Sequence, residues 1–383
     1  MLNKSIVTIN LTVYNGEKYI RQCLDSVLAQ TYPHELIEIN ILDNASTDST
    51  VEKINNWKLE IGNWKFKFNF VQSKFNLGMW PAQEELLKYS HGKYVIVLSV
   101  DVILHPDFLK NAIGTMERDP QIGALQAKVY KYELTESQVE KTNIIDTIGF
   151  KIYRSRRIVN IGHGEEDKGQ HDKDVSCFAP YFAKGYGGQN KATQDTAKIC
   201  YKQIFAVEGA VPVFRRQALE TCRLQSQLLK LSFNKDGAIV DPDFFWYGDD
   251  LDLAWRMRIF GWKQVYAPSV IAWHDRKTTK SLAGGWKNFI KIRKLVPLFK
   301  RRLDWRNTTL AIIKNDFASN ILRDLSHIFW RQLRLWGYFL IFEPAMFIEI
   351  FNVAKMLPKM LKRRREIMQK DKISAKEFRK WIT

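Results

Sequence analysis

Apolar runs alternate with amphipathic stretches along the first hundred residues of the chain. The apolar and β-branched runs predict strands at 5–14, 37–42, 68–72 and 94–98. Stretches with helical spacing of apolar positions separate them, and the first such helix is expected at 17–29. Alternation of this kind predicts an α/β fold, with a mostly parallel sheet that carries helices on both faces.

The pattern is less regular farther along the chain. Residues 146–203 include the Gly-rich, charged stretch IGHGEEDKGQHDKD, which predicts a loop able to order over a ligand. Their last part, 180–203, is typical of an insertion. Strand character returns at 204–214, a helix is expected to begin near Arg216, and a short strand is expected at 264–267.

Charge divides the chain into two parts. Residues 276–383 carry 26 Lys and Arg against eight Asp and Glu, a net charge of +18, whereas the preceding residues carry 33 of each sign. We therefore expect an α/β domain at 1–275, with halves at 1–101 and 102–275, followed by a basic helical appendage at 276–383. A basic appendage indicates an anionic partner, either nucleic acid or a membrane surface.

The apolar content of the appendage favours the membrane. Residues 330–361 are rich in Trp, Phe, Leu and Ile, and the basic run KRRR follows at once. The part from 336 to 353 is about long enough to span a bilayer, but Glu343 and Glu349 lie inside it, and a mid-membrane acid costs about 2.5 kcal/mol or more. We expect a cytoplasmic protein that is peripheral on the inner face of the cell membrane, bound to its anionic surface, with no nucleic-acid partner. The alternative is a helical module that packs on the rest of the chain or on a second subunit.

The cysteines and the N-terminus indicate the same compartment. The four cysteines lack metal-like spacing and are expected to be reduced packing residues of a cytosolic protein: Cys23, Cys177, Cys200 and Cys222. No signal peptide is expected, because MLNKSIVTINLTVYN lacks a long apolar core and a small-residue cleavage site.

Acidic residues are concentrated in 241–274, between the aromatic run FFWY and an amphipathic helix pattern. Asp252 is expected to pair with Arg256 four residues later on that helix. Asp249 and Asp250 lie at the predicted helix start, beside the aromatic residues. A carboxylate held there in a partly dry pocket can act as a general base, and Asp250 is the candidate.

Two more acids follow predicted strands. Asp43 comes directly after the second strand and Asp101 after the fourth. Because ligands of α/β sheets bind at the carboxyl ends of the strands, these two acids are expected at one functional edge.

These landmarks, in this order, resemble the family 2 glycosyltransferases with the GT-A fold. The matching pieces cover residues 5 to about 275 and read TVYNGEKYIRQCLDSVLAQTY, ILDNASTDST, FNLGM, VIVLSVD, VEGAVPVFRRQALE and FFWYGDDLDLAWRMRIFGW, with a downstream His. DTIGFK, GEEDKGQHD and RNTTLAIIKND are similar to bacterial rhamnosyltransferase-type members, which build polysaccharides on lipid carriers. The resemblance implies inverting transfer of a sugar, such as rhamnose, from a UDP- or dTDP-sugar to a hydroxyl of a lipid-linked saccharide or polysaccharide.

The resemblance also implies roles for individual residues. Residues in the first half would bind the nucleotide-sugar donor: Thr12, Tyr14, Asn15, Asp43, Asn76, Gly78 and Asp101. Residues in the second half would bind the acceptor: Glu208, Gly209, Trp246, Tyr247 and Asp249. Asp250 matches the general base of the family, and Asp101 and His274 would hold Mn²⁺ or Mg²⁺ on the donor diphosphate.

The sequence departs from the family at one acid. Ser99-Val100-Asp101 stands where the DxD-type motif of the family begins with a carboxylate. The missing acid leaves a thinner cation site, and it raises the importance of His274, whose alternative role is that of a core or helix-start histidine.

Two other functions compete with sugar transfer. Sugar-phosphate nucleotidyltransferases share the architecture, but they need a Gly-rich phosphate loop, and TVYNGEKYI has one Gly. A non-catalytic fold could serve as the membrane-bound partner of a polysaccharide assembly complex, with Ser99 as a sign of decay. The intact set of Asp43, Asp101 and Asp250 favours an enzyme.

Overall fold

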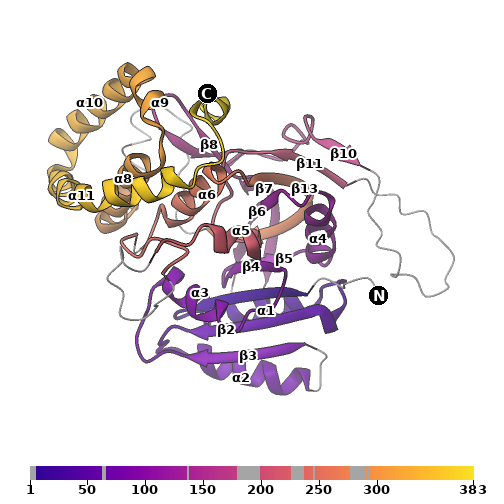
Figure 1. Cartoon of the computed structure of the whole chain (residues 1–383). Helices are drawn as coiled ribbons and strands as arrows, with labels where there is room; N and C mark the ends of the chain where they lie inside the picture. The colour runs from indigo at the N-terminus through magenta and orange to yellow at the C-terminus, as the bar shows by residue number, and fades with distance from the viewer. Residues whose placement is uncertain are drawn as a thin grey trace.

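An 11-stranded sheet runs through the computed structural model, and helices pack on both of its faces (Figure 1). Its main strand order is β10-β11-β13-β6-β12-β4-β1-β2-β3, with β5 beside β13 and β7 beside β6. The structure describes residues 6–62, 66–135, 138–178, 199–225, 237–244, 246–276, 290 and 293–383.

Four parallel strands form the first half of the sheet: β1 (Val7–Val13), β2 (Ile37–Asp43), β3 (Lys67–Gln72) and β4 (Tyr94–Ser99). Helical segments connect them: α1 (Ile20–Leu28), η1 (His34–Leu36), α2 (Thr50–Ile61) and α3 (Met79–Leu87). All four strands agree with the predicted runs, because each is apolar over its full length or on one face.

The second half of the sheet is mixed, which corrects the expectation of a mostly parallel sheet. β6 (Ile122–Leu134) and β13 (Lys263–His274) are parallel to each other, but β12 (Val213–Arg215) runs antiparallel to both β4 and β6. Shorter strands complete this half: β5 (Val102–Leu104), β7 (Val139–Thr147), β10 (Ser176–Phe178) and β11 (Ile199–Gln203). A separate hairpin is formed by β8 (Phe150–Ile152) and β9 (Ile158–Asn160). The helices of this half are α4 (Phe108–Arg118), α5 (Arg216–Thr221) and α6 (Asp249–Ile259).

Two predicted strands differ from the structure in length. The strand expected at 204–214 is restricted to β12, which begins at Val213, because residues 204–212 make an isolated bridge from Ala206 to Phe150 and single backbone hydrogen bonds to β4 rather than a continuous ladder. The strand expected at 264–267 extends to 12 residues as β13, and register shifts along it accompany its long pairing with β6. The expected insertion at 180–203 lies outside the described residues, except for β11.

The cysteine prediction is wrong for one pair. Cys177 and Cys200 face each other across the antiparallel β10–β11 pair, and their sulfurs are bonded at 2.07 Å. Cys23 and Cys222 are free and buried, as expected. The strand register brings together two cysteines that the sequence separates by 23 residues.

Side chains of β4 show how the sheet divides the core. Val95 and Val97 pack in the hydrophobic cluster that contains α5 and α6, whereas Tyr94, Ile96 and Leu98 pack in the cluster that contains α1 and α4. Alternate residues of a strand point to opposite faces, so a run that is apolar throughout supplies both layers. The predicted α/β fold with helices on both faces is confirmed.

The C-terminal region is helical, as expected: α8 (Leu298–Asn315), α9 (Ala318–Arg323), α10 (Leu325–Phe342), η3 (Pro344–Phe347), α11 (Ile348–Gln369), α12 (Ala375–Phe378) and η4 (Arg379–Trp381). It packs beside α6 (Figure 1) and shares a core with it, since the ring of Phe378 stacks on Trp255 with 5.7 Å between centroids. Buried Lys314 of α8 contacts Asp252 of α6 at 2.8 Å, and Asp252 also pairs with Arg256, as predicted.

Glu343 ends α10 and divides the apolar run of the appendage. It pairs with Arg293 at 3.0 Å and with Arg301, and Glu349 pairs with Arg302 at 2.6 Å, so arginines of the same region neutralise both acids. No helix among the described residues is long and apolar enough to cross a membrane. Large apolar side chains nevertheless remain exposed on and beside α10. We call them the α10 apolar face: Leu322, Leu325, Phe329, Trp330, Leu333, Trp336, Leu340, Ile341 and Phe342.

Candidate functional site

Asp43 lies at the carboxyl end of β2, on the edge that the sequence predicts. Its side chain is buried, and both carboxylate oxygens lie 3.3 Å from the backbone N–H of Ser46. The next residue, Asn44, accepts a hydrogen bond from the Leu77 N–H at 2.7 Å and donates one to the Gly78 carbonyl at 3.1 Å. The carboxyl end of β2 is thereby joined to the turn that precedes α3.

Asn76 and Gly78 form the turn that leads into α3. The side chain of Asn76 accepts a hydrogen bond from the Gly78 N–H at 2.8 Å, and Gly78 takes a φ of 87°, a conformation that favours glycine. This turn lies beside Asp43 through the Asn44 contacts, so three of the predicted donor residues share one edge.

The β1 end contributes the remaining predicted donor residues. Thr12 pairs in register with Ser99 of β4, and Tyr14 is half exposed just beyond the strand. Asn15 has a positive φ of 50°, and its side chain accepts a hydrogen bond from the Thr47 N–H at 2.8 Å. These residues lie at the carboxyl ends of β1 and β4, the side of an α/β sheet on which ligands usually bind.

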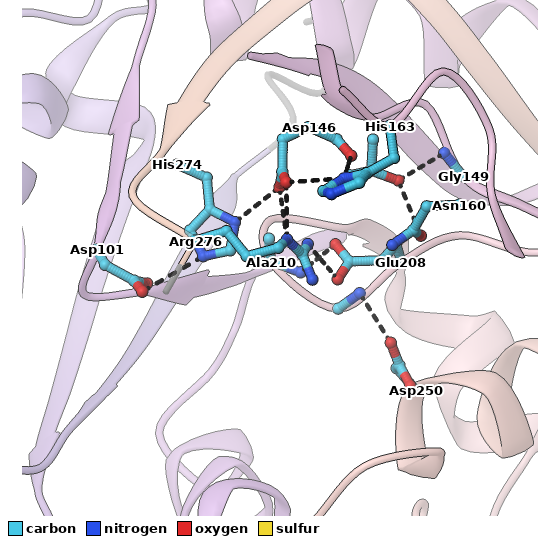
Figure 2. A network of polar contacts seen from close by, with 12 residues as sticks. Asp101, Asp146, Gly149, Asn160, His163, Glu208, Ala210, Asp250, His274 and Arg276 are labelled. Carbon is cyan, nitrogen blue, oxygen red and sulfur yellow. Dashed lines mark hydrogen bonds and ion pairs between the residues drawn. The ribbon is translucent and has the colours of Figure 1, made fainter. Parts of the chain in front are cut away.

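Asp101 and His274 lie side by side (Figure 2), as the sequence predicts. Asp101 follows β4 and His274 ends β13; His274 Nε2 is 3.3 Å from Asp101 Oδ2. The other ring nitrogen, Nδ1, is 2.9 Å from a carboxylate oxygen of Asp146 on β7. Burial favours the neutral ring, but the charges and hydrogen bonds of Asp101 and Asp146 outweigh it and raise the pKa of His274 to about 10.

Asp146 is the centre of a buried polar network (Figure 2). It accepts hydrogen bonds from Arg276 Nε at 2.7 and 2.9 Å and lies 3.4 Å from His163 Nδ1. Burial alone would raise the pKa of Asp146, but the two histidines and the charge of Arg276 hold it well below its usual range. Arg276 continues the network to Glu208, whose Oε1 accepts a hydrogen bond at 2.7 Å.

Glu208 and Gly209 connect this network to Asp250. Glu208 Oε2 accepts from the Ala210 N–H at 3.0 Å, which fixes the bend, and the Gly209 N–H donates to Asp250 Oδ2 at 3.1 Å. The Leu251 N–H donates to Asp250 Oδ1 at 2.7 Å. Asp250 is thus oriented by two backbone donors, and polar contacts connect Asp101 at one end of the site to Asp250 at the other (Figure 2).

Asp249 and Asp250 are neighbouring acids at the start of α6. Burial raises the pKa of both carboxyl groups, and the charges of Asp249 and Glu208 raise that of Asp250 further. Asp249 Oδ2 is buried without a hydrogen-bond partner in the described part of the chain. A carboxylate with a raised pKa is a stronger base than an ordinary one, which suits proton abstraction from a hydroxyl.

The loop before Asp250 is held by the C-terminal region. Tyr247 and Gly248 both take positive φ values, 65° and 76°, directly before α6. Buried Asn307 of α8 donates its side-chain amide to the Trp246 carbonyl at 2.9 Å and to the Tyr247 carbonyl at 2.7 Å. Trp246 and Tyr247 lie ring beside ring and half exposed, a few residues before Asp250. Their contact with an acceptor remains a prediction.

Asp101 and His274 fit a divalent cation in donor type and spacing. Two ligands that each lie about 2.1 Å from one ion, at right angles, are about 3 Å apart, close to the 3.3 Å observed between them. His274 would bind such an ion through Nε2 without its proton. No cluster of three or more His, Cys, Asp or Glu in the described ranges could hold a metal, so diphosphate oxygens and water would complete the shell.

Four residues of the site were not predicted as site residues: Asp146, His163, Arg276 and Asn307. Each lies in or beside a stretch that stood out in the sequence. Asp146 begins DTIGFK, His163 is in the Gly-rich loop, and Asn307 is in RNTTLAIIKND. Those stretches indicated a subgroup, but only the packing of β7, β13 and α8 shows which of their side chains reach the site.

Comparison with known proteins identifies the family. The family model described as Glycosyl transferase family 2 matches residues 8–206, just over half of the chain. The chain therefore belongs to glycosyl transferase family 2. Together with the mixed α/β sheet and the C-terminal helices, this membership confirms the expected GT-A-like fold.

Individual relatives are similar over part of their length. The poly-beta-1,6-N-acetyl-D-glucosamine synthase of Staphylococcus epidermidis is 22% identical over 315 residues, which cover 82% of this chain and 57% of that protein. A Methanococcus voltae protein, dolichyl N-acetyl-alpha-D-glucosaminyl phosphate 3-beta-D-2,3-diacetamido-2,3-dideoxy-beta-D-glucuronosyltransferase, is 32% identical over 118 residues, 30% of this chain and 35% of that one. The chain thus spans about half or less of these relatives.

Among solved structures, a mannosyltransferase from Pyrobaculum calidifontis in complex with GDP-Man and Mn²⁺ aligns over 98% of this chain and 79% of its own, with 15% identity and a TM-score of 0.48.

Proposed function

We propose that this chain is an inverting glycosyltransferase that moves a sugar from a nucleotide-sugar donor to a hydroxyl group. The observation that carries the proposal is the polar network that connects Asp101, at the donor edge of the sheet, to Asp250 at the start of α6 (Figure 2). Asp101, at one end, is suited to hold a cation on the donor diphosphate, and Asp250, at the other end, is suited to take a proton from a hydroxyl. Membership of glycosyl transferase family 2 supports this assignment.

Asp250 acts as the general base in this proposal. Its carboxylate takes the proton of the acceptor hydroxyl as the oxygen forms a bond to the anomeric carbon, and the bond from that carbon to the donor diphosphate breaks. Because one carboxylate activates the incoming oxygen opposite the leaving group, the configuration at the anomeric carbon is inverted. Gly209 N–H and Leu251 N–H hold the carboxylate in place at 3.1 and 2.7 Å.

The leaving diphosphate requires neutralisation. Asp101 and His274 would hold Mn²⁺ or Mg²⁺ there, and such an ion stabilises the negative charge that develops on the departing oxygens. Asp146 orients the His274 ring through Nδ1, a second contact of the kind that fixes metal-binding histidines. Asp43, Asn76 and Gly78 border the same edge, where the nucleoside part of the donor would bind.

The proposed donor sugar and acceptor rest on weaker resemblances than the proposed reaction does. Similarity of DTIGFK, GEEDKGQHD and RNTTLAIIKND to rhamnosyltransferase-type members supports a rhamnose donor on UDP or dTDP. The names of the two relatives describe a polysaccharide product and a dolichyl-phosphate-linked acceptor, which support a polysaccharide or lipid-linked acceptor.

The membrane is the proposed location of the acceptor. Residues 276–383 carry a net charge of +18, and the α10 apolar face is exposed. Basic side chains near an anionic bilayer gain about 1 kcal/mol each, and apolar side chains that enter the interface add a part that salt does not screen. We propose that the chain binds peripherally to the cytoplasmic face of the cell membrane through this surface.

A donor panel tests the proposal. The purified chain is heated with UDP-, dTDP- and GDP-sugars, with and without Mn²⁺, and the true donor should raise the melting temperature because it binds only the folded state. That donor is then supplied with a lipid-linked saccharide, and release of the nucleoside diphosphate is measured. A chain that is stabilised by no nucleotide sugar, with or without Mn²⁺, would contradict the proposal.

A further inference from the structure

A pocket of about 620 Å³ lies between α10 and the turn that joins β8 to β9. Arg157 of the turn and His327, Arg331 and Arg334 of α10 line it, and no Asp or Glu is among its described lining residues. The volume is in the range of small-molecule sites. Guanidinium groups bind phosphate oxygens through paired N–H donors, so three of them around one pocket make it suited to an anion.

Buried ion pairs fix the two walls of the pocket against each other. Arg156, in the same turn, is fully buried with a φ of 60°; its guanidinium pairs with Asp316 at 2.6 Å and with Asp324 at 2.7 Å. Asp324 is the N-cap residue of α10, and Arg154 also pairs with it at 2.8 Å. The nearby carboxylates are therefore occupied by Arg154 and Arg156, which leaves Arg157 for the pocket.

The pocket arginines are short of negative charge. Within the described ranges, neither Arg157 nor Arg334 has a carboxylate in ion-pair distance. Burial lowers the pKa of Arg331, and the positive charge of Arg157 lowers it further against the opposing effect of Asp304. An anion between these groups would relieve the repulsion and satisfy their donors.

The pocket borders the α10 apolar face. Trp330 lines the pocket and is also a member of that face, with 56% of its surface exposed. Phe329 and Leu333 beside it on α10 are exposed as well. A ligand with an anionic head and an apolar tail matches this arrangement, because its head would reach the arginines while its tail stays with the apolar side chains.

We propose that this pocket binds the terminal phosphate or diphosphate headgroup of a membrane lipid. The proposal rests on the membrane association in the proposed function, and it adds a specific lipid site to a general basic surface. Several arginines favour a headgroup with a terminal phosphate, which offers more charge and more free oxygens than the phosphodiester of ordinary phospholipids.

Vesicle binding by the full chain tests the proposal. One set of vesicles contains phosphatidylcholine with diacylglycerol pyrophosphate, and the other contains phosphatidylglycerol adjusted to the same surface potential. The pocket variant is Arg157→Gln with Arg334→Gln. The matched control is Lys355→Gln with Lys362→Gln, two exposed lysines of α11 that also cost two charges. The melting temperature of each variant is measured, and Arg334→Gln alone serves if the double variant does not fold.

Wild type should bind the diphosphate vesicles about tenfold more tightly than the phosphatidylglycerol vesicles, and excess pyrophosphate should compete. The pocket variant should lose this tenfold preference, and the lysine control should keep it. Equal losses in both variants would overturn the proposal, because the effect would then be general charge attraction. Binding of free pyrophosphate as tight as that of the vesicles would also overturn it, in favour of a soluble anion.

The result is independent of sugar transfer. Donor hydrolysis without an acceptor should be unchanged in the pocket variant, and Asp250→Asn should keep the vesicle preference. A wrong glycosyltransferase assignment would therefore appear as an unchanged sugar-transfer rate in Asp250→Asn. A wrong lipid site would appear as an unchanged vesicle preference in the pocket variant.

Discussion

Replacement of Asn307 by Ala should slow turnover indirectly, because Asn307 holds the loop before Asp250 through the carbonyls of Trp246 and Tyr247. Asn307 is buried and donates to the carbonyls of Trp246 and Tyr247 at 2.9 and 2.7 Å. Its loss removes both of these hydrogen bonds, and a hydrogen bond of this kind contributes about 0.5–1.5 kcal/mol. Tyr247 also holds a left-handed conformation that costs about 1–2 kcal/mol. The loop before Asp250 should therefore leave its present geometry for part of the time.

A loss of about 1.4–2.8 kcal/mol in the stability of the catalytic loop conformation corresponds to a fall in turnover of about 10- to 100-fold, since about 1.4 kcal/mol is tenfold. Nucleoside diphosphate release at saturating donor measures it, and the donor Kd should be unchanged. Asn320→Ala is the control, because Asn320 of α9 donates to one backbone carbonyl, that of Ala375 at 2.9 Å, away from the loop. If Asn307→Ala and Asn320→Ala lower the melting temperature alike and both keep wild-type turnover, the positioning role of Asn307 is refuted.

Three further predictions concern the network itself. Burial raises the pKa of the Asp249 and Asp250 carboxyls, and Asp250 can act as a base only when it is ionised. We therefore expect kcat/KM to rise tenfold per pH unit below the pKa of Asp250 and to level off above it. The bend should lie well above about pH 4, the ordinary pKa of an Asp. Gly209→Ala should lower turnover about tenfold, because its Cβ would lie 3.1 Å from the Asp250 carboxylate, whereas Gly337→Ala, with open space around it, should not. Asp101→Asn should abolish the gain in donor binding that Mn²⁺ gives to wild type, and a variant that still responds to Mn²⁺ would exclude Asp101 as a ligand.

The first half of the fold is predictable from the sequence because its strands are buried. β1, β2 and β4 are buried along nearly their whole length. β4 is almost wholly apolar, β1 and β2 carry apolar residues at alternate positions, and turns rich in Asn, Asp and Gly separate these strands from amphipathic helices. β7 gives no such signal. Within the described ranges β6 is its one strand partner, its first six residues are exposed or half-buried, and its sequence VEKTNIIDT lacks a long apolar run. The mixed order of the second half depends on pairings that no local pattern specifies.

The site divides in the same way. Asp43, Asp101 and Asp250 were predictable because each follows a strand or starts a helix, positions that local sequence reveals. Asp146 contacts His274 across 128 residues of chain, so its place in the site depends on how β7 and β13 pack.

Two other features of the chain depend equally on distant packing. Asn307 contacts Tyr247 across 60 residues, and the contact requires α8 to pack on the loop before α6. The Cys177–Cys200 bond likewise depends on the β10–β11 register, which scattered cysteine positions in the sequence do not disclose.

The most direct test of the central claim is the rate of sugar transfer by Asp250→Asn under saturating donor and acceptor. Asn keeps the shape of the side chain, and its one carbonyl oxygen can accept from either the Gly209 or the Leu251 N–H, which donate to different oxygens of Asp250. It cannot take the proton of the acceptor hydroxyl. The account predicts an unchanged donor Kd and a fall in kcat of about 100-fold or more. Turnover close to that of wild type would show that Asp250 is not the base, and it would contradict the mechanism proposed for this site.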